Sequence, residues 1–262
     1  MIVMKRAGFT LIELLVVIGI LCVLMALTST VSHSVREQAR ATKCQKNIKD
    51  QCLGLFAYSI ENGCFPRGMV LSFNTISDVA FDPPAKWWFE SIGQEYDIVH
   101  KLVQCPAKQL DSSRQKHNVL WGNYGANWSI FSSSDLLMPN NVHDFARTSL
   151  AYGRVRNPGQ VLLIMDSGHS LLGRQHAANP VKDFSVFQGA LATSYIPGLS
   201  TNKDRELHIF QRADADEGRH PDHSVNVGFA DGHVDKKKAD DLSVGQTAEG
   251  HYTNRTPLWK PR

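Results

Sequence analysis

Four side chains near the C-terminal end of the sequence have the types and spacing of metal ligands. His220 and His223 form an HxxH pair, and Asp231 and His233 follow closely. The HExxH helix of a metallopeptidase also carries a glutamate, and Pro221 argues against a helix at this point. We therefore interpret the segment as a solvated polar loop, with structural zinc or a catalytic metal as the alternatives.

The rest of the sequence contains no arrangement typical of a catalytic site. It has no nucleophile-elbow serine, no glycine-rich phosphate loop and no cysteine–histidine nucleophile pair. The formal net charge of +3 gives no reason to expect nucleic acid or an acidic partner. We therefore expect that the protein is not an enzyme and does not bind nucleic acid.

The cysteines are the second group that could do chemistry. Cys22 lies in a long apolar stretch, so Cys44, Cys52, Cys64 and Cys105 remain for an oxidising compartment, where four thiols allow three pairings. Cys44 and Cys52 lie in a segment of helical pattern, about 12 Å apart along the axis and beyond the ~7 Å Cα limit of a disulfide. One pairing is thereby excluded. The other two pairings and buried free thiols remain open.

The apolar run at residues 9–27 is expected to determine on which side of a membrane the rest of the chain lies. Its only charge is Glu13. At ~1.5 Å per residue, a helix of this length measures ~28 Å and can cross the hydrocarbon core of a bilayer. Lys5 and Arg6 precede the run and are expected to stay on the cytoplasmic side, with the C-terminal bulk on the other side.

The helical pattern continues beyond this run. Residues 28–60 contain no proline, and Gly54 is their only glycine. The sequence predicts a helix over residues 10–60 that ends at Asn62-Gly63. Its apolar stripe is expected to consist of Val31, Val35, Ala39, Cys44, Ile48, Cys52 and Leu55 or Phe56.

The residues at the start of this helix resemble a known family. Lys5-Arg6-Ala7-Gly8 followed by Phe9-Thr10-Leu11-Ile12-Glu13 is similar to the leader and junction of type IV prepilins and type II secretion pseudopilins. The resemblance implies cleavage after Gly8 by prepilin peptidase and N-methylation of Phe9. An ordinary secretory signal, cut within residues 26–32, is the alternative, but such a signal has no use for Glu13.

Glu13 is unusual because an acidic group inside a bilayer is costly and usually needs a partner. We expect Glu13 to pair with a cation from another copy of the chain, the amine of a processed Phe9, during assembly. The alternative is a glutamate close enough to the interface to reach headgroups and water.

Two strands are predicted in the C-terminal half. Residues 161–165 form an apolar run that ends at Asp166, as expected for a buried strand. Residues 225–229 alternate with period two and lead into Asp231-Gly232, which favours a two-residue hairpin turn. In that register Phe229 is opposite Val234, and one face is buried. The other face is expected to be open and to carry Asn226, Gly228, Ala230, His233 and Asp235.

The remaining segments are expected to be largely irregular. Residues 97–104 are interpreted as a short helix or strand, and residues 123–127 as a turn. The aromatic run at residues 87–89 is interpreted as core or as cover for a loop, rather than as a ligand platform. Residues 173–222 are expected to be loops with at most one short helix.

The hairpin extends the family resemblance. Arg219-His220 together with residues 229–234 is similar to the C-terminal His…Asp-Gly signature of a pseudopilin subgroup, although ten residues separate His220 from Asp231 here and His223-Ser224 replaces the usual glycine pair. We expect His220, Asp231, Gly232 and His233 to form the signature site, with a polar cluster of His220, Asp231 and His233 on the open face of the hairpin.

The resemblance also implies a disulfide and suggests a cation. Cys44 and Cys105 match positions of the family and are expected to pair, which leaves Cys52 with Cys64. Some major pseudopilins bind Ca²⁺ in a C-terminal loop. By that analogy the calcium candidates are Asp214, Asp216 and Asp222, whose carboxylates are suitable oxygen ligands. No other cofactor is expected.

The fold class expected from these features is α+β and pilin-like, with a long N-terminal helix packed on a small antiparallel sheet and irregular loops. Residues 1–8 are a cleaved basic leader, residues 9–32 a transmembrane and polymerisation helix, and residues 33–262 an extracytoplasmic domain in which residues 33–60 continue the helix.

The expected function is structural. A single-pass subunit of the inner membrane, with its N-terminus inside, is processed by prepilin peptidase. It then polymerises with other pseudopilin subunits, like or unlike, on an assembly platform into a type II secretion-like pseudopilus. The alternatives are a type IV pilin for adhesion or motility, and a membrane-anchored extracytoplasmic binding or enzymatic domain.

Overall fold

The structure, a computed structural model, describes residues 9–71, 85–93, 101–113, 116, 118–131, 149–179, 194–245 and 259. The chain divides into two compact units, residues 1–39 and 40–262. The predicted leader at residues 1–8 and the first half of the predicted element at residues 97–104 lie outside the described residues. Residues 101–103 of that element are helical.

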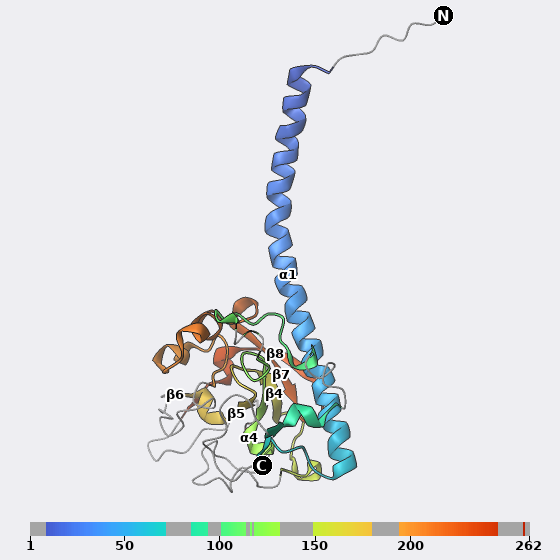
Figure 1. Ribbon diagram of the computed structural model, residues 1–262, viewed down its shortest axis with the longest axis vertical. Coiled ribbons are helices and arrows are strands. Elements are labelled where there is room, and N and C mark those ends of the chain that lie inside the picture. Colours follow the sequence, from blue (N-terminus) through green and yellow to red (C-terminus); the bar gives the residue numbers. More distant parts are fainter. Residues whose placement is uncertain are drawn as a thin grey trace, which may run out of the picture. The chain divides into compact units, whose positions relative to one another are not determined.

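Helix α1 spans Leu11–Asn62 without interruption and is drawn in blue in Figure 1. Thr10 and Glu13 form a reciprocal capping box at its start, in which Glu13 Oε2 accepts hydrogen bonds from the Thr10 backbone N–H at 2.9 Å and from its hydroxyl at 2.8 Å. The Glu13 N–H donates to Thr10 Oγ1 at 3.3 Å. At the other end Gly63 has a φ of 75°, a left-handed conformation that terminates helices and that glycine adopts without steric cost. The predicted helix and its end at Asn62-Gly63 are confirmed.

The domain half of α1 buries only part of the predicted apolar stripe. Cys44, Ile48, Cys52 and Leu55 are fully buried, whereas Val35 is 59% exposed. These four residues follow one another at intervals of three or four, so they lie on one face of the helix. The stripe therefore becomes a packing surface from Cys44 onward.

A mixed sheet lies in the second unit. Its strands are β3 (Tyr124–Asn127), β4 (Leu162–Asp166), β5 (Leu171–Leu172), β7 (Ser224–Phe229) and β8 (Val234–Lys238), in the order β5-β3-β4-β7-β8. The pairs β3–β4, β4–β7 and β7–β8 are antiparallel, and β3–β5 is parallel. The α+β class is confirmed, and the sheet is mostly rather than wholly antiparallel.

The two central strands show one correct and one wrong prediction. The predicted buried strand at residues 161–165 is β4. The run at residues 123–127, predicted as a turn, forms β3 instead, because its polar side chains find partners inside the fold. Asn127 Nδ2 donates to the Leu162 and Trp259 carbonyls at 2.8 and 3.0 Å. A Cβ at Gly125 would lie 2.7 Å from Ser167 Cβ, so the glycine permits a close approach.

Both faces of the sheet are covered, and every residue of β7 is buried. On one face Val225, Val227 and Phe229 belong to a cluster with Leu162 and Met165. The other face packs on α1, since a Cβ at Gly228 would lie 2.5 Å from Cys52 Sγ and 2.7 Å from Ile48 Cγ2 (Figure 1). The hairpin face predicted to be open is therefore covered by the helix.

The hairpin itself differs from the prediction by one residue in register. Gly228, not Phe229, pairs with Val234. The turn has three residues, 230–232, because the Gly232 N–H donates to Phe229 O and the Phe229 N–H donates to His233 O, both at 2.9 Å. Asp-Gly suits a two-residue turn, but a glycine at positive φ, here 87°, also completes a three-residue loop. His233 therefore shares a face with Phe229.

Short elements complete the described part of the chain. The aromatic run at residues 87–89 is buried, as predicted. Two small sheets pair β1 (Met69–Leu71) with β2 (Ala85–Trp87), antiparallel, and β6 (Ala178–Asn179) with β9 (Val244–Gly245), parallel. The short helices are η2 (Trp88–Ser91), α4 (Trp128–Phe131), η4 (Tyr152–Arg154), η5 (Arg174–Ala177), η7 (Ser200–Asp204), η8 (Ile209–Gln211), η9 (Ala213–Glu217), η10 (Pro221–His223) and η11 (Ala239–Leu242). Four of them, η5 and η7 to η9, lie within residues 173–222, and η10 begins there, whereas at most one was expected.

Candidate functional site

The first candidate site is the start of α1. Phe9 is 80% exposed, and the apolar side chains that follow it are also exposed, from Leu11 at 81% to Val17 at 45%. Gly8, the predicted cleavage residue, lies outside the described residues. No helix within the part of the chain that the structure describes combines the length and apolarity of a membrane span.

The capping box at this site was missed by sequence reasoning. Thr10 and Glu13 have the Thr-x-x-Glu spacing that predicts one, so the signal was present. Glu13 therefore has a structural partner within its own chain, in addition to the partner expected during assembly.

The second candidate site is built around His220 and Asp166. Asp166 ends the central strand β4, and His220 precedes the short helix η10. His220 Nε2 lies 3.1 Å from Asp166 Oδ2, and the same oxygen accepts hydrogen bonds from the Asn226 backbone N–H at 2.6 Å and from Asn226 Nδ2 at 3.1 Å. The side chains of the pair are buried, with exposed fractions of 1% for His220 and 0% for Asp166.

Electrostatics favour the ionised form of this pair. Burial, the largest single effect, would raise the pKa of Asp166, but the charge and hydrogen bond of His220, the charge of Arg219 and the hydrogen bond from the Asn226 N–H together hold that pKa below its usual range. Burial likewise opposes charge on His220, and the Asp166 carboxylate outweighs it and raises the pKa of the imidazole. Asp166 and His220 therefore form a buried ion pair that links η10 to the centre of the sheet.

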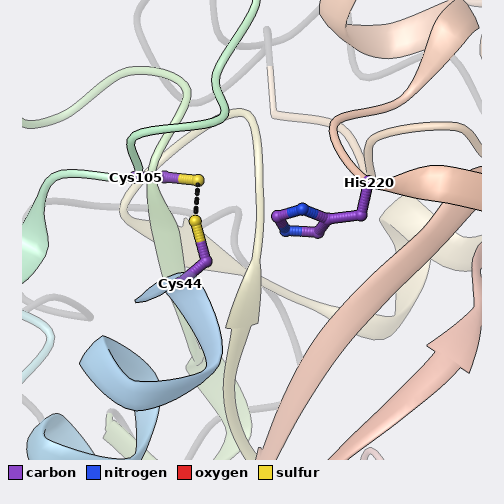
Figure 2. Close-up of side chains that lie close together, drawn as sticks. All are labelled: Cys44, Cys105 and His220. Carbon is purple, nitrogen blue, oxygen red and sulfur yellow. Dashed lines mark hydrogen bonds between the residues drawn. The ribbon is translucent and has the colours of Figure 1, made fainter. Parts of the chain in front are cut away.

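Cys44 and Cys105 lie next to this pair. Their sulfur atoms are 2.7 Å apart, and Figure 2 shows the His220 ring directed toward them. The Cys105 N–H donates to Asn123 Oδ1 at 2.9 Å, which positions the loop that carries Cys105. Burial, followed by the hydrogen bond with Cys105, raises the pKa of the Cys44 thiol. Burial also opposes ionisation of Cys105, but the hydrogen bond from Cys44 and the positive charges of Arg219 and His220 together lower its pKa.

The structure supports one of the two expected disulfides better than the other. All five cysteines are free in the structure. The two sulfur atoms are 2.7 Å apart, closer than van der Waals contact but farther than the ~2.05 Å of a disulfide bond. The two cysteines are therefore adjacent, and the Cys44–Cys105 bridge stays a prediction. For Cys52 and Cys64 the helix argues against the expected pairing. Because α1 continues to Asn62, about 15 Å beyond Cys52, two more residues cannot bring the Cα atoms within the ~7 Å limit.

Arg219 forms a third part of the buried centre, which sequence reasoning did not assign. Its guanidinium donates to both oxygens of Asp214, at 2.7 to 2.9 Å, and to the Ser167 carbonyl at 2.6 Å. The same carboxylate accepts hydrogen bonds from the Tyr195 hydroxyl at 2.7 Å and the Gln109 N–H at 3.0 Å. Burial disfavours the charged guanidinium, but Asp214 outweighs it and raises the pKa of Arg219.

This pairing also bears on the calcium candidates. Asp214 is fully buried and occupied by Arg219, while Asp216 lies 3.6 Å from Arg212 and Asp222 is exposed at the surface. The described residues do not bring these three carboxylates together as a metal-binding group. Asp214 and Asp216 are therefore engaged in the protein's own ion pairs, and Asp222 is not brought together with them.

The predicted polar cluster of His220, Asp231 and His233 does not form. Asp231 and His233 pair with each other at 2.6 Å at the exposed turn, and His233 stacks on Phe229 with ring centroids 4.2 Å apart. Burial opposes ionisation of Asp231, but the hydrogen bonds and charge of His233 together outweigh it and lower the pKa of this carboxyl. His220 is engaged in the core, so the signature residues form two separate groups.

The HxxH segment was predicted to be a solvated polar loop, which is wrong for His220, because this residue is buried in the core. His223 is exposed with a φ of 49°, whereas His220 is buried. In the described part of the chain, the side chains that could hold a metal ion are instead Cys44, Cys105 and His220, whose ligand atoms lie within 4.8 Å of one another. Their separation in sequence hides this group from any short motif.

Comparison with known proteins identifies the first site. Residues 3–29 match the family model of the prokaryotic N-terminal methylation motif. Comparisons with curated proteins and with solved structures gave no match. The motif is typical of type IV pilins and pseudopilins, and it supports processing by prepilin peptidase and pilus-like assembly.

Proposed function

We propose that this protein is a structural subunit of a type II secretion-like pseudopilus. Prepilin peptidase removes residues 1–8, and Phe9 becomes the methylated N-terminus. Residues 9–32 hold the subunit in the cytoplasmic membrane with the domain outside. The subunit then polymerises with other pseudopilin subunits on the assembly platform. The observation that carries the proposal is the match of residues 3–29 to the methylation motif.

The exposed apolar surface of α1 supports assembly. The side chains of residues 11–18 are all roughly half exposed or more. Moving one such Leu, Ile or Val side chain out of water is worth about 1.5–3 kcal/mol. Lipid provides such an environment before assembly, and the matching helices of neighbouring subunits provide it within a filament. Because α1 is continuous through Asn62, the same helix also reaches the folded domain.

Glu13 supports an assembly role for the same surface. The capping box satisfies its carboxylate by hydrogen bonds but leaves its charge uncompensated. Cleavage after Gly8 creates a positively charged amine at Phe9, one turn before Glu13. In a filament, the amine of an adjacent subunit neutralises the carboxylate, so neither charge stays alone in an apolar core.

The test is to isolate filaments and identify their subunits by mass spectrometry, together with phenotypes of a deletion strain. The proposal expects this chain in filaments with methylated Phe9 first, and a deletion strain that fails to release secreted proteins but still adheres and moves normally. Loss of adhesion or motility with normal secretion would identify a pilus subunit instead. A chain that keeps Met1 in a strain with active prepilin peptidase would overturn both assignments.

A further inference from the structure

Three sulfur and nitrogen donors converge in the core of the second unit. Cys44 comes from α1, Cys105 from the loop after residues 101–103, and His220 from the residue before η10. Their ligand atoms lie within 4.8 Å of one another, and all three residues are buried (Figure 2). Segments far apart in the sequence thus bring three possible metal ligands together in the buried centre of the domain.

Two buried atoms at this group have no hydrogen-bond partner. They are Nδ1 of His220 and Oδ1 of Asp166. The Nε2–H of His220 donates to Asp166 Oδ2, which orients the ring, and Asn226 Nδ2 donates to the same carboxylate oxygen. Buried polar atoms without a partner are rare in folded proteins and call for an explanation such as an ion. The free nitrogen belongs to the same ring whose edge faces the two sulfurs in Figure 2.

A carboxylate, Asp166, contacts one nitrogen of the His220 ring, and the ring faces two thiols. Metal sites commonly have this arrangement. A histidine that binds a metal through one ring nitrogen commonly donates its other N–H to a carboxylate, which fixes the tautomer and the orientation of the ring. Two thiolates and one imidazole are ligands for zinc, whereas calcium and magnesium require oxygen. This donor set therefore selects a soft or borderline transition metal.

We propose that the protein with reduced cysteines binds one Zn²⁺ ion between Cys44 Sγ, Cys105 Sγ and His220 Nδ1, with Asp166 as the positioning residue. Each thiol loses its proton on binding and the His220 imidazolium loses the proton on Nδ1, so three protons are released per zinc ion and no electrons are transferred. A water molecule takes the fourth tetrahedral position.

The site and the predicted disulfide are alternative states of the same two sulfurs. Two thiolates at ~2.3 Å from a tetrahedral zinc ion are about 3.8 Å apart. Starting from 2.7 Å, the sulfurs separate when they bind zinc and approach when they form a disulfide. Zinc is therefore expected to bind only after reduction and to protect these thiols from oxidation.

The test uses the full chain in detergent, reduced by a phosphine and titrated with Co²⁺ as a spectroscopic substitute for Zn²⁺. The expected result is one Co²⁺ per chain with thiolate-to-cobalt charge-transfer bands, which Zn²⁺ abolishes by displacement. Cys44→Ser, Cys105→Ser and His220→Ala should each weaken binding at least tenfold. The matched controls Cys64→Ser and His223→Asn should bind as the parent does.

A second measurement needs no variant. Zinc should slow alkylation of Cys44 and Cys105 in the reduced parent chain, as mapped by peptide mass spectrometry, and leave the alkylation of Cys64 unchanged. The proposal is wrong if the reduced parent shows no charge-transfer bands, if zinc does not protect these two thiols, or if the Cys44→Ser and Cys105→Ser variants both keep the bands.

Discussion

His220 Nε2 lies 3.1 Å from Asp166 Oδ2, although the two residues are 54 positions apart in the sequence. The pair connects η10 to the end of the central strand β4, and its side chains are almost completely buried. Removing one member leaves the other charge in the core without its partner. His220 is therefore a structural residue of the domain, unlike the exposed His233 of the same signature.

The first prediction follows from this burial. Because an uncompensated buried charge is left behind, His220→Ala should lower the free energy of unfolding by about 3–5 kcal/mol. His233→Ala, at the exposed turn, should lower it by no more than about 1 kcal/mol through the lost stacking on Phe229. Denaturant unfolding of the purified chains measures both. Equal effects of the two substitutions would contradict the assignment of His220 to the core.

The second prediction concerns processing. Mass spectrometry of the membrane-extracted protein should find Phe9 as a methylated N-terminus. Gly8→Leu should block maturation, because a side chain at the scissile residue obstructs the peptidase site that the motif implies. Gly19→Leu is the matched control, since nothing lies within 4 Å of a Cβ at Gly19. Normal processing of Gly8→Leu, or cleavage within residues 26–32, would refute the prediction.

The third prediction separates the two roles of Glu13. Gln at the third helical position can still complete a capping box but carries no charge, whereas Leu can do neither. If neutralisation of the Phe9 amine drives assembly, Glu13→Gln and Glu13→Leu should both be processed and yet both be depleted from filaments. Quantitative immunoblots of sheared filaments and of membranes measure the ratio. Normal incorporation of Glu13→Gln alone would assign the residue to helix capping.

Thr10 provides the complementary control. Thr10→Ser keeps the hydroxyl that accepts the hydrogen bond from the Glu13 N–H, and Thr10→Ala removes it. Because the charge of Glu13 is intact in both variants, we expect both to assemble. Failure of Thr10→Ala with success of Thr10→Ser would show that the cap itself is required.

The fourth prediction concerns the cysteines of protein from an oxidising compartment. Non-reducing peptide mapping should find Cys44 joined to Cys105, with Cys52 and Cys64 as thiols. Oxidation transfers two electrons and two protons to an external disulfide. The bridge would close a loop of 61 residues and add about 4 kcal/mol to the free energy of unfolding in the chain-entropy model. Reductant should therefore destabilise the parent and Cys64→Ser but have no effect on Cys105→Ser.

The fifth prediction is a pH dependence of stability. Burial lowers the pKa of both His169 and His176 to about 3, from an ordinary 6.5. Between those values these two histidines bind more protons in the unfolded chain than in the folded one, so their contribution to stability is complete above about pH 6.5 and falls as the pH decreases. Each histidine contributes a slope of about 1.4 kcal/mol per pH unit in this window.

Substitution tests that slope. His169→Asn should reduce the slope of the free energy of unfolding against pH by about 1.4 kcal/mol per pH unit, the contribution of one histidine. His223→Asn, at an exposed position, should leave the slope unchanged. Denaturant unfolding at several pH values between 4 and 7 supplies the measurement. An unchanged slope in His169→Asn would show that this imidazole is protonated in the folded state.

The features that sequence alone determined are those whose causes are local. The methylation motif depends on residues that are consecutive in the chain. Helix α1 and its end at Gly63 follow from a periodic pattern and a glycine, and strand β4 follows from an uninterrupted apolar run. In each case, residues close together in the sequence both form the recognisable pattern and make the local interactions that stabilise the element.

Tertiary structure alone decided where the C-terminal signature residues lie. Asp231-Gly232 is compatible with turns of two or three residues, and only the packing of Gly228 against Cys52 and Ile48 on α1 selects the register. His220 meets Asp166, Cys44 and Cys105 through a fold that brings α1, β4 and two loops together. Contacts between residues so far apart depend on how complete surfaces pack, which no short stretch of sequence encodes.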